Sequence, residues 1–130
     1  MSESTFKDEA RLYYVPYILG NTPEAHKLSR RIYRKFGIIS VICDSRRSVF
    51  DLFDLSSRTV VLSSTDSPRL IAEQLLSLAS QTRYTLPLII SVSHEFEQAI
   101  AYEREILERS FVICEVDTLF DTSPLADFPC

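Results

Sequence analysis

Three short loop segments carry the residues whose types could bind a small ligand. Each segment follows an apolar run, and together they supply a tight turn, hydroxyls, a carboxylate, a guanidinium and an imidazole. The residues are Gly20, Asn21, Thr22, Asp44, Arg46, Ser93 and His94. Amides at a helix start attract anions, a carboxylate some 20 residues after a glycine turn suits a ribose, and histidine titrates near neutral pH. We therefore expect a ligand site here. Plain turns and solvated surface groups are the alternative interpretation.

The chemistry available to these residues is limited. The full dinucleotide-binding pattern needs two further glycines after Gly20, and Glu24 and Ala25 follow instead. The sequence also has no Walker lysine, no nucleophile–base set and no Cys-x-x-Cys motif. We expect no catalytic residue, no metal site and no phosphoryl transfer by this chain alone.

Strands and helices alternate along the chain and must position these loops. We predict strands at about 13–19, 38–43, 59–62, 88–92 and 111–115, and helices at about 23–36, 68–82 and 94–109, with a short irregular piece at 48–55. Asn21 or Thr22 caps the first helix, Ser93 caps the last, and Gly37 ends the first in a left-handed conformation. This alternation predicts an α/β fold. We expect a Rossmann-like three-layer sandwich with a five-stranded parallel sheet in the order 3-2-1-4-5.

The predicted strand order has two consequences. Ligands of open α/β sheets bind beyond the carboxyl ends of the strands where the order reverses, which here is between the strands that end near Gly20 and Ser93. The same order separates the strands of Cys43 and Cys114 by about 14 Å, which is too far for a disulfide. We expect both cysteines to be buried free thiols.

Length and composition predict one soluble cytoplasmic domain. The chain has 130 residues, of which 45% are apolar and 25% charged. We predict a flexible lead-in at 1–11, an α/β domain at 12–116 and an irregular tail at 117–130. The net charge of −4 gives no general attraction to nucleic acid or anionic lipid, so neither is expected as a partner, and no apolar run is long enough to cross a bilayer.

Four basic residues share one face of the helix at 23–36, opposite its apolar stripe. They are Lys27, Arg30, Arg31 and Arg34. Such a face suits an acidic partner or a polyanion. A simple solvated outer surface is the alternative.

Two stretches of the sequence resemble a known family. The run at 15–20 followed by a helix that closes on Phe36 and Gly37, and the run at 88–96 followed by 103–107, are similar to the opening domain of ATP-grasp carboxylate–amine ligases, D-aspartate ligase-like enzymes above all. The resemblance covers about residues 12–115. Where that family usually carries a Gly-Asp pair after the fourth strand, this chain has Ser93 and His94.

The resemblance implies a Rossmann-like pre-ATP-grasp domain that is not catalytic by itself. In that family ATP and Mg²⁺ are held by two further lobes, which this chain lacks, so the chain is expected to be a fragment of a longer ligase or a free-standing domain. An amino-acid or carboxylate substrate, ATP-grasp lobes and self-association are the partners implied.

Two other functions remain open from the residues alone. The first is a stand-alone module that binds a nucleotide or another small ligand. The second is a protein-interaction module, because a domain without its lobes should expose an apolar face. The candidates for that face are Phe50, Leu52, Phe53, Leu119 and Phe120.

Overall fold

A five-stranded parallel sheet forms the centre of the fold. The computed structural model describes residues 14–81 and 85–116. The strands are β1 (Tyr14–Leu19), β2 (Ser40–Asp44), β3 (Ser57–Val61), β4 (Leu86–Ser91) and β5 (Val112–Cys114). The helices are α2 (Pro23–Phe36), α3 (Pro68–Ser80), α4 (His94–Tyr102) and α5 (Arg104–Leu107), with a 3₁₀ helix η1 (Val49–Leu52). The strand order β3-β2-β1-β4-β5 confirms the predicted fold class.

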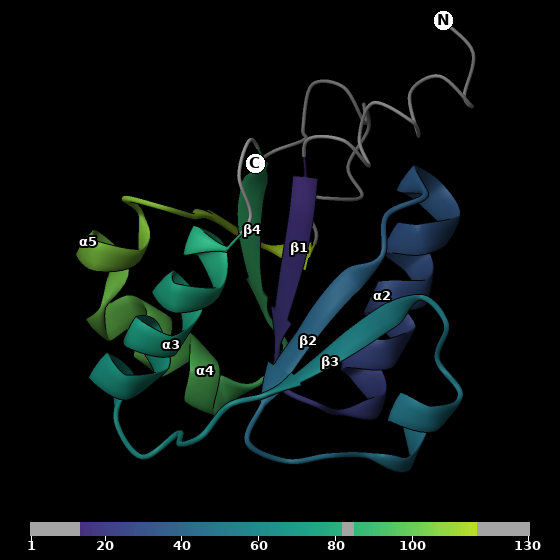
Figure 1. Cartoon of the computed structure of the whole chain (residues 1–130), viewed down its shortest axis with the longest axis horizontal. Helices are drawn as coiled ribbons and strands as arrows, with labels where there is room; N and C mark the ends of the chain where they lie inside the picture. Colours follow the sequence, from purple (N-terminus) through teal and green to yellow (C-terminus); the bar gives the residue numbers. More distant parts are fainter. Residues whose placement is uncertain (1–13, 82–84, 117–130) are drawn as a thin grey trace, which may run out of the picture.

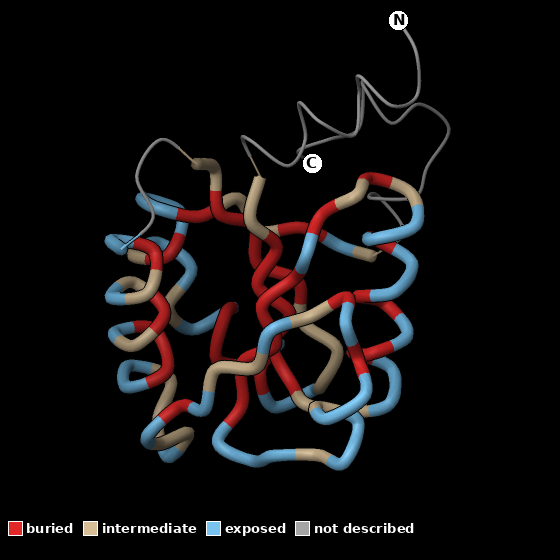
Figure 2. Tube along the Cα trace, turned by 45° about the vertical axis from the view of Figure 1, so that its right-hand side comes forward, coloured by how far each residue is buried: buried red, intermediate tan, exposed pale blue. Residues whose placement is uncertain are grey.

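The sheet lies between two helical layers (Figure 1). Helix α2 covers one face, and α3, α4 and α5 cover the other. Successive strand residues point to opposite faces, so Ile18 and Ile42 pack with α2 while Tyr17 and Cys43 pack with α3 and α4. Buried backbone accordingly runs through the centre of the molecule (Figure 2). Both faces of the sheet are core, which explains the nearly continuous apolar strands.

The helix ends follow local sequence signals. Thr22, Ser67 and Ser93 each accept a hydrogen bond from the backbone N–H three residues further on. Gly37 ends α2 at φ 73° and donates its N–H to the Tyr33 carbonyl. These contacts confirm the predicted caps, with Thr22 rather than Asn21 at the start of α2.

Pro16 lies inside β1 and affects only one of its two neighbours. It pairs with Leu88 on β4, whereas pairing with β2 begins at Tyr17. Proline has no N–H to donate to a ladder. Pairing with β2 therefore begins only after Pro16, whereas pairing with β4 continues through it.

The last predicted helix is two helices, and several strand ends differ from the prediction. Glu103 interrupts the helix with φ −111° and ψ 23°, and its Oε1 lies 3.3 Å from Nε of Arg69 on α3. Helix α4 therefore ends before Glu103, and α5 begins after it. Strand β2 begins two residues later than predicted and β3 two residues earlier. The predicted lead-in and tail lie outside the described residues.

The two strand cysteines differ in state. Cys43 is a buried free thiol, and burial raises its pKa to about 12, opposed by Arg58 and reinforced by Asp44. Cys114 is disulfide-bonded, so the prediction of a free thiol is wrong for this residue. The strand order excluded a bridge to Cys43 only, and Cys43 is indeed free.

Candidate functional site

The turns after β1 and β4 pack directly against each other. Gly20 adopts φ 112°, and a Cβ there would lie 3.1 Å from Val92 Cγ2 and 3.5 Å from Ser93 Cβ. The amide of Gly20 donates to the Cys43 carbonyl at 2.9 Å, and that of Val92 donates to the Leu19 carbonyl at 3.1 Å. Glycine is therefore needed here for both its backbone conformation and the close approach. The structure confirms that these two turns are neighbours.

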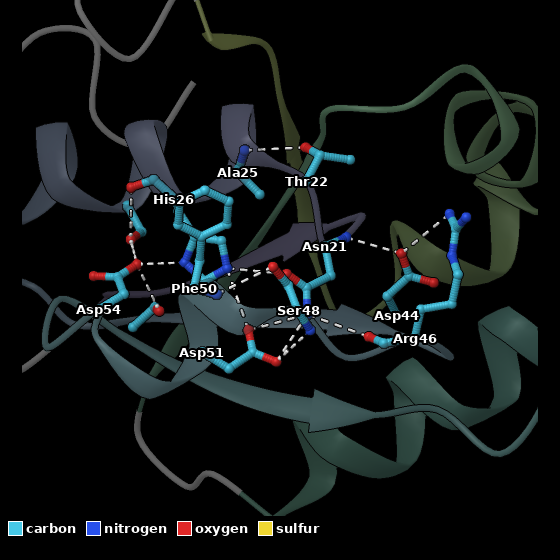
Figure 3. Close-up of polar contacts among 12 residues, drawn as sticks. Asn21, Thr22, Ala25, His26, Asp44, Arg46, Ser48, Phe50, Asp51 and Asp54 are labelled. Atoms are coloured by element: carbon cyan, nitrogen blue, oxygen red, sulfur yellow. Dashed lines mark hydrogen bonds and ion pairs between the residues drawn. The ribbon is translucent and has the colours of Figure 1, made fainter.

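Asp44 joins the turns after β1 and β2 (Figure 3). Its Oδ2 accepts the Asn21 amide at 2.8 Å, and its Oδ1 accepts the Ser45 amide at 2.7 Å. Nη2 of Arg46 lies 3.6 Å from the same carboxylate. Asp44 is only 2% exposed, and both of its carboxylate oxygens are engaged in these contacts within the protein. Ribose binding by Asp44 stays a prediction.

The remaining predicted ligand residues lie at the helix starts. The hydroxyls of Thr22 and Ser93 are used as N-caps. The side chain of His94 is 82% exposed and lies near Glu97 and Gln98 of its own helix. Thr22 thus shares the neighbourhood of Asn21 and Asp44, while His94 lies on an exposed helix surface.

A buried polar cluster that the sequence analysis missed joins α2 to the segment between β2 and β3 (Figure 3). At its centre is His26, which is 0% exposed. Its Nδ1 lies 2.6 Å from Asp54 Oδ2, and its Nε2 lies 2.9 Å from Asn21 Oδ1 and 3.2 Å from Asp51 Oδ1. The Asn21 Nδ2 donates to Asp51 and to the Arg46 carbonyl, which turns the amide oxygen toward His26. Both imidazole nitrogens therefore face oxygen atoms of neighbouring side chains.

Asp54 accepts five hydrogen bonds within this cluster. Its Oδ2 accepts from His26, Ser29 and Ser57, and its Oδ1 accepts from the backbone and hydroxyl of Ser56. Burial alone would raise the pKa of Asp54, but hydrogen bonds from Ser56, His26 and Ser29 outweigh it and hold the pKa well below its ordinary value. Asp54 is thus a buried anion whose oxygens are fully used.

Asp51 fixes the start of η1. Its Oδ2 accepts the Ser48 amide at 2.9 Å, and the Ser48 hydroxyl accepts the Phe50 amide in return, which forms a capping box. Burial opposes ionisation of Asp51, yet hydrogen bonds from the Ser48 backbone and from Asn21 and Thr59 keep its pKa below the ordinary value. The segment between β2 and β3 is therefore tied to α2 by two carboxylates.

The same segment directs large apolar side chains into solvent. We call residues 49–55 the apolar loop, because Leu52 and Phe53 are 79% and 78% exposed and Leu55 is 91% exposed. Val49 and Phe50 are exposed as well, and the Phe50 ring lies 5.6 Å from the His26 ring. The predicted exposure of Phe50, Leu52 and Phe53 is thus confirmed. Leu119 and Phe120 lie outside the described residues.

Two pockets are lined by residues other than the predicted ligand residues. One is an open groove of about 570 Å³ between α2 and the apolar loop, lined by Arg30, Tyr33, Arg34, Phe53, Asp54, Leu55 and Ser56. The other, of about 460 Å³, lies at the carboxyl ends of β4 and β5 beside α4, and Glu97, Arg104 and Glu115 contribute charges to it.

Helical spacing was the available signal for the missed cluster. His26 and Ser29 are three residues apart on α2, and Asp51 and Asp54 are three apart on the other side. Positions three apart share a helix face, which groups His26 with Ser29, whereas Asp54 lies beyond the end of η1 and does not share a helix with Asp51. The spacing within α2 and the spacing of the two aspartates do not show by themselves that α2 contacts the segment between β2 and β3.

The described part of the chain contains neither a metal-binding cluster nor a membrane-spanning helix. Within residues 14–81 and 85–116, no group of three or more His, Cys, Asp or Glu side chains could hold a metal ion, and no helix is long and apolar enough to cross a bilayer. No family model, curated protein or solved structure matched the chain.

Proposed function

We propose that this chain is a non-catalytic, Rossmann-like domain of the pre-ATP-grasp kind that docks on another protein unit through its apolar loop. One observation carries the proposal. The loop is held by contacts of the buried His26 with Asp54, which is also buried, and with the partly buried Asp51, while Leu52, Phe53 and other large apolar side chains face solvent. Anchoring an apolar segment in an exposed position is typical of an interface.

In this proposal the polar cluster holds the apolar loop in place and takes no part in a chemical reaction. The carboxylates of Asp51 and Asp54 and the imidazole of His26 are satisfied by one another and by neighbouring side chains. No group in the cluster is left to attack or protonate a substrate. The cluster instead sets the direction of the loop, so that its apolar side chains are presented together.

The partner units that fit the proposal are a pair of ATP-grasp lobes or a second copy of the chain. With lobes, ATP and Mg²⁺ would be bound by the partner unit, and the amino-acid or carboxylate substrate would be shared with it. The cytoplasmic location stays a prediction, and the disulfide at Cys114 is a feature more common in oxidising compartments.

A second candidate function is binding of a small ligand, and the pocket beside α4 favours it. Its volume of about 460 Å³ lies within the range of known ligand pockets, and it lies at the carboxyl ends of strands, where α/β folds bind ligands. Arg104 supplies a positive charge to this pocket, although its Nε already lies 2.7 Å from Oε1 of Glu108. Calorimetry with ATP, AMP and amino acids tests this candidate, and absence of heat at millimolar ligand would remove it.

Site-specific photo-crosslinking tests docking through the loop. A photo-reactive residue replaces Leu55 in one variant and Leu70, an exposed leucine on α3, in the control. We expect one defined crosslinked protein, identified by mass spectrometry, from the Leu55 variant alone. Equal crosslinking from both positions would overturn docking, and ATP hydrolysis by the purified chain would overturn the non-catalytic assignment.

A further inference from the structure

The groove between α2 and the apolar loop combines positive charge with apolar surface. Arg30 and Arg34 are four residues apart on α2, so their side chains lie on the same face. Tyr33 lies beside them, and Phe53 and Leu55 form the opposite wall. The groove therefore offers two guanidinium groups next to three large, exposed apolar or aromatic side chains.

The charge of the groove is not neutralised from within. Neither Arg30 nor Arg34 forms an ion pair or a side-chain hydrogen bond with any residue in the described part of the chain. Among the described residues that line the groove, Asp54 is the only one with a carboxylate, and its oxygens already accept hydrogen bonds from His26, Ser29, Ser56 and Ser57. The two guanidinium groups are thus free to pair with carboxylates from outside.

The geometry points to an acidic peptide segment with large apolar side chains as the occupant of this groove, supplied by another protein chain. The inference rests on the proposed docking function and names the chemistry of the partner. Carboxylates would pair with Arg30 and Arg34 in the fork geometry that guanidinium favours, while an aromatic or aliphatic side chain would cover Phe53 and Leu55. The groove volume of about 570 Å³ suits a few side chains of a segment.

A polyanion such as nucleic acid fits the same surface less well. It would pair with the arginines but would leave Phe53 and Leu55 beside a charged backbone, and the whole chain carries a net charge of −4. A second copy of this chain is a further possible occupant. Both alternatives are outcomes of the test below.

Fluorescence anisotropy with synthetic peptides tests the inference. The probe is a fluorescein-labelled peptide of sequence Asp-Glu-Phe-Asp-Leu-Glu-Phe-Asp. One comparison peptide has lysine at every acidic position, and another has serine at every apolar position. We expect saturable binding of the probe and weaker binding of both comparison peptides, because the groove requires charge and apolar surface together.

Paired variants locate the binding. Arg30→Gln combined with Arg34→Gln should weaken probe binding about tenfold, and Leu55→Ser should weaken it as well. Arg109→Gln and Leu70→Ser, which change exposed residues outside the groove, serve as matched controls and should leave binding unchanged. Circular dichroism and thermal unfolding check that each variant is folded.

Four results would overturn the inference. They are absence of probe binding, equal binding by the double arginine variant, tighter binding of a single-stranded oligonucleotide at the same arginines, and self-association in sedimentation velocity that Leu55→Ser abolishes. The last result would make a second copy the occupant. A defined Leu55 crosslink without probe binding would remove this inference alone. Probe binding without a crosslink would remove the proposed docking function.

Discussion

Nδ1 of His26 lies 2.6 Å from Oδ2 of Asp54, and both side chains are buried. This contact joins helix α2 to the segment that ends the apolar loop, over a sequence separation of 28 residues. It is supported by Asn21 and Asp51 on the second imidazole nitrogen. The relationship explains how an exposed apolar segment keeps a defined position on the surface.

Replacement of His26 should destabilise the protein strongly. His26→Ala leaves the buried carboxylate of Asp54 and the partly buried carboxylate of Asp51 without their imidazole partner, and removing the partner of a buried charge costs about 3 kcal/mol or more. Urea unfolding followed by circular dichroism measures the free energy of unfolding. His94→Ala removes the other, exposed histidine and should change this free energy by less than about 0.5 kcal/mol. Equal effects of the two substitutions would contradict the structural role of His26.

The lowered carboxylate pKa values predict a loss of stability in acid. The pKa values of Asp51 and Asp54 lie below the ordinary value of 3.8 in the folded protein. Their contribution is therefore present above the unfolded-state pKa and is lost as the pH falls through the folded-state pKa. Denaturant unfolding at pH values between about 5 and 2 should show this decline.

Asp54→Asn isolates the contribution of one carboxylate. The variant should be less stable at neutral pH by about 2 kcal/mol, since the hydrogen bonds to a charged acceptor become weaker, and its stability should fall less steeply in acid. Asp66→Asn changes an exposed aspartate and should keep the wild-type pH profile. If the free energy of unfolding falls equally in acid for wild type and Asp54→Asn, the contacts of Asp54 do not lower its pKa in the folded protein.

Gly20 and Gly37 should respond differently to substitution. Gly20→Ala places a Cβ 3.1 Å from Val92 Cγ2 at φ 112°, a conformation that costs an L-residue about 1 to 3 kcal/mol. Gly37→Asn keeps a left-handed helix end at φ 73°, which asparagine tolerates. Thermal unfolding should therefore show a clearly larger loss for Gly20→Ala. A larger loss for Gly37→Asn would contradict the close packing of the turns after β1 and β4.

Cys43 should resist alkylation in the folded protein. Its thiol is buried, and its pKa is raised to about 12 chiefly by burial, so little thiolate forms at neutral pH. Peptide mapping by mass spectrometry after brief iodoacetamide treatment should find Cys43 unmodified in native protein and modified in denaturant. Rapid modification in the native state would mean that the sheet is open at β2.

Much of the fold follows from local sequence, and the predictions on it were largely correct. The apolar runs at β1, β2 and β4, the hydroxyl caps at Thr22 and Ser93 and the left-handed Gly37 all depend on residues close in the chain. Ligand binding by the predicted residues at the switch point stays a prediction, and the structure shows only which of them are neighbours. Gly20 and Ser93 are neighbours, and Asn21 contacts Asp44, but their polar groups serve the turns themselves.

The amino-acid sequence by itself determined the alternation of strands and helices and, through the rules of parallel sheets, the order of the strands. Only the tertiary structure decided which polar groups meet. His26 could be assigned no role until the fold brought Asp51 and Asp54 to it, and Arg30 and Arg34 form a groove only because the apolar loop lies opposite them. The physical reason is the sequence separation over which each interaction acts. Backbone propensity and capping act over a few residues, whereas burial and charge pairing depend on segments that are distant in sequence.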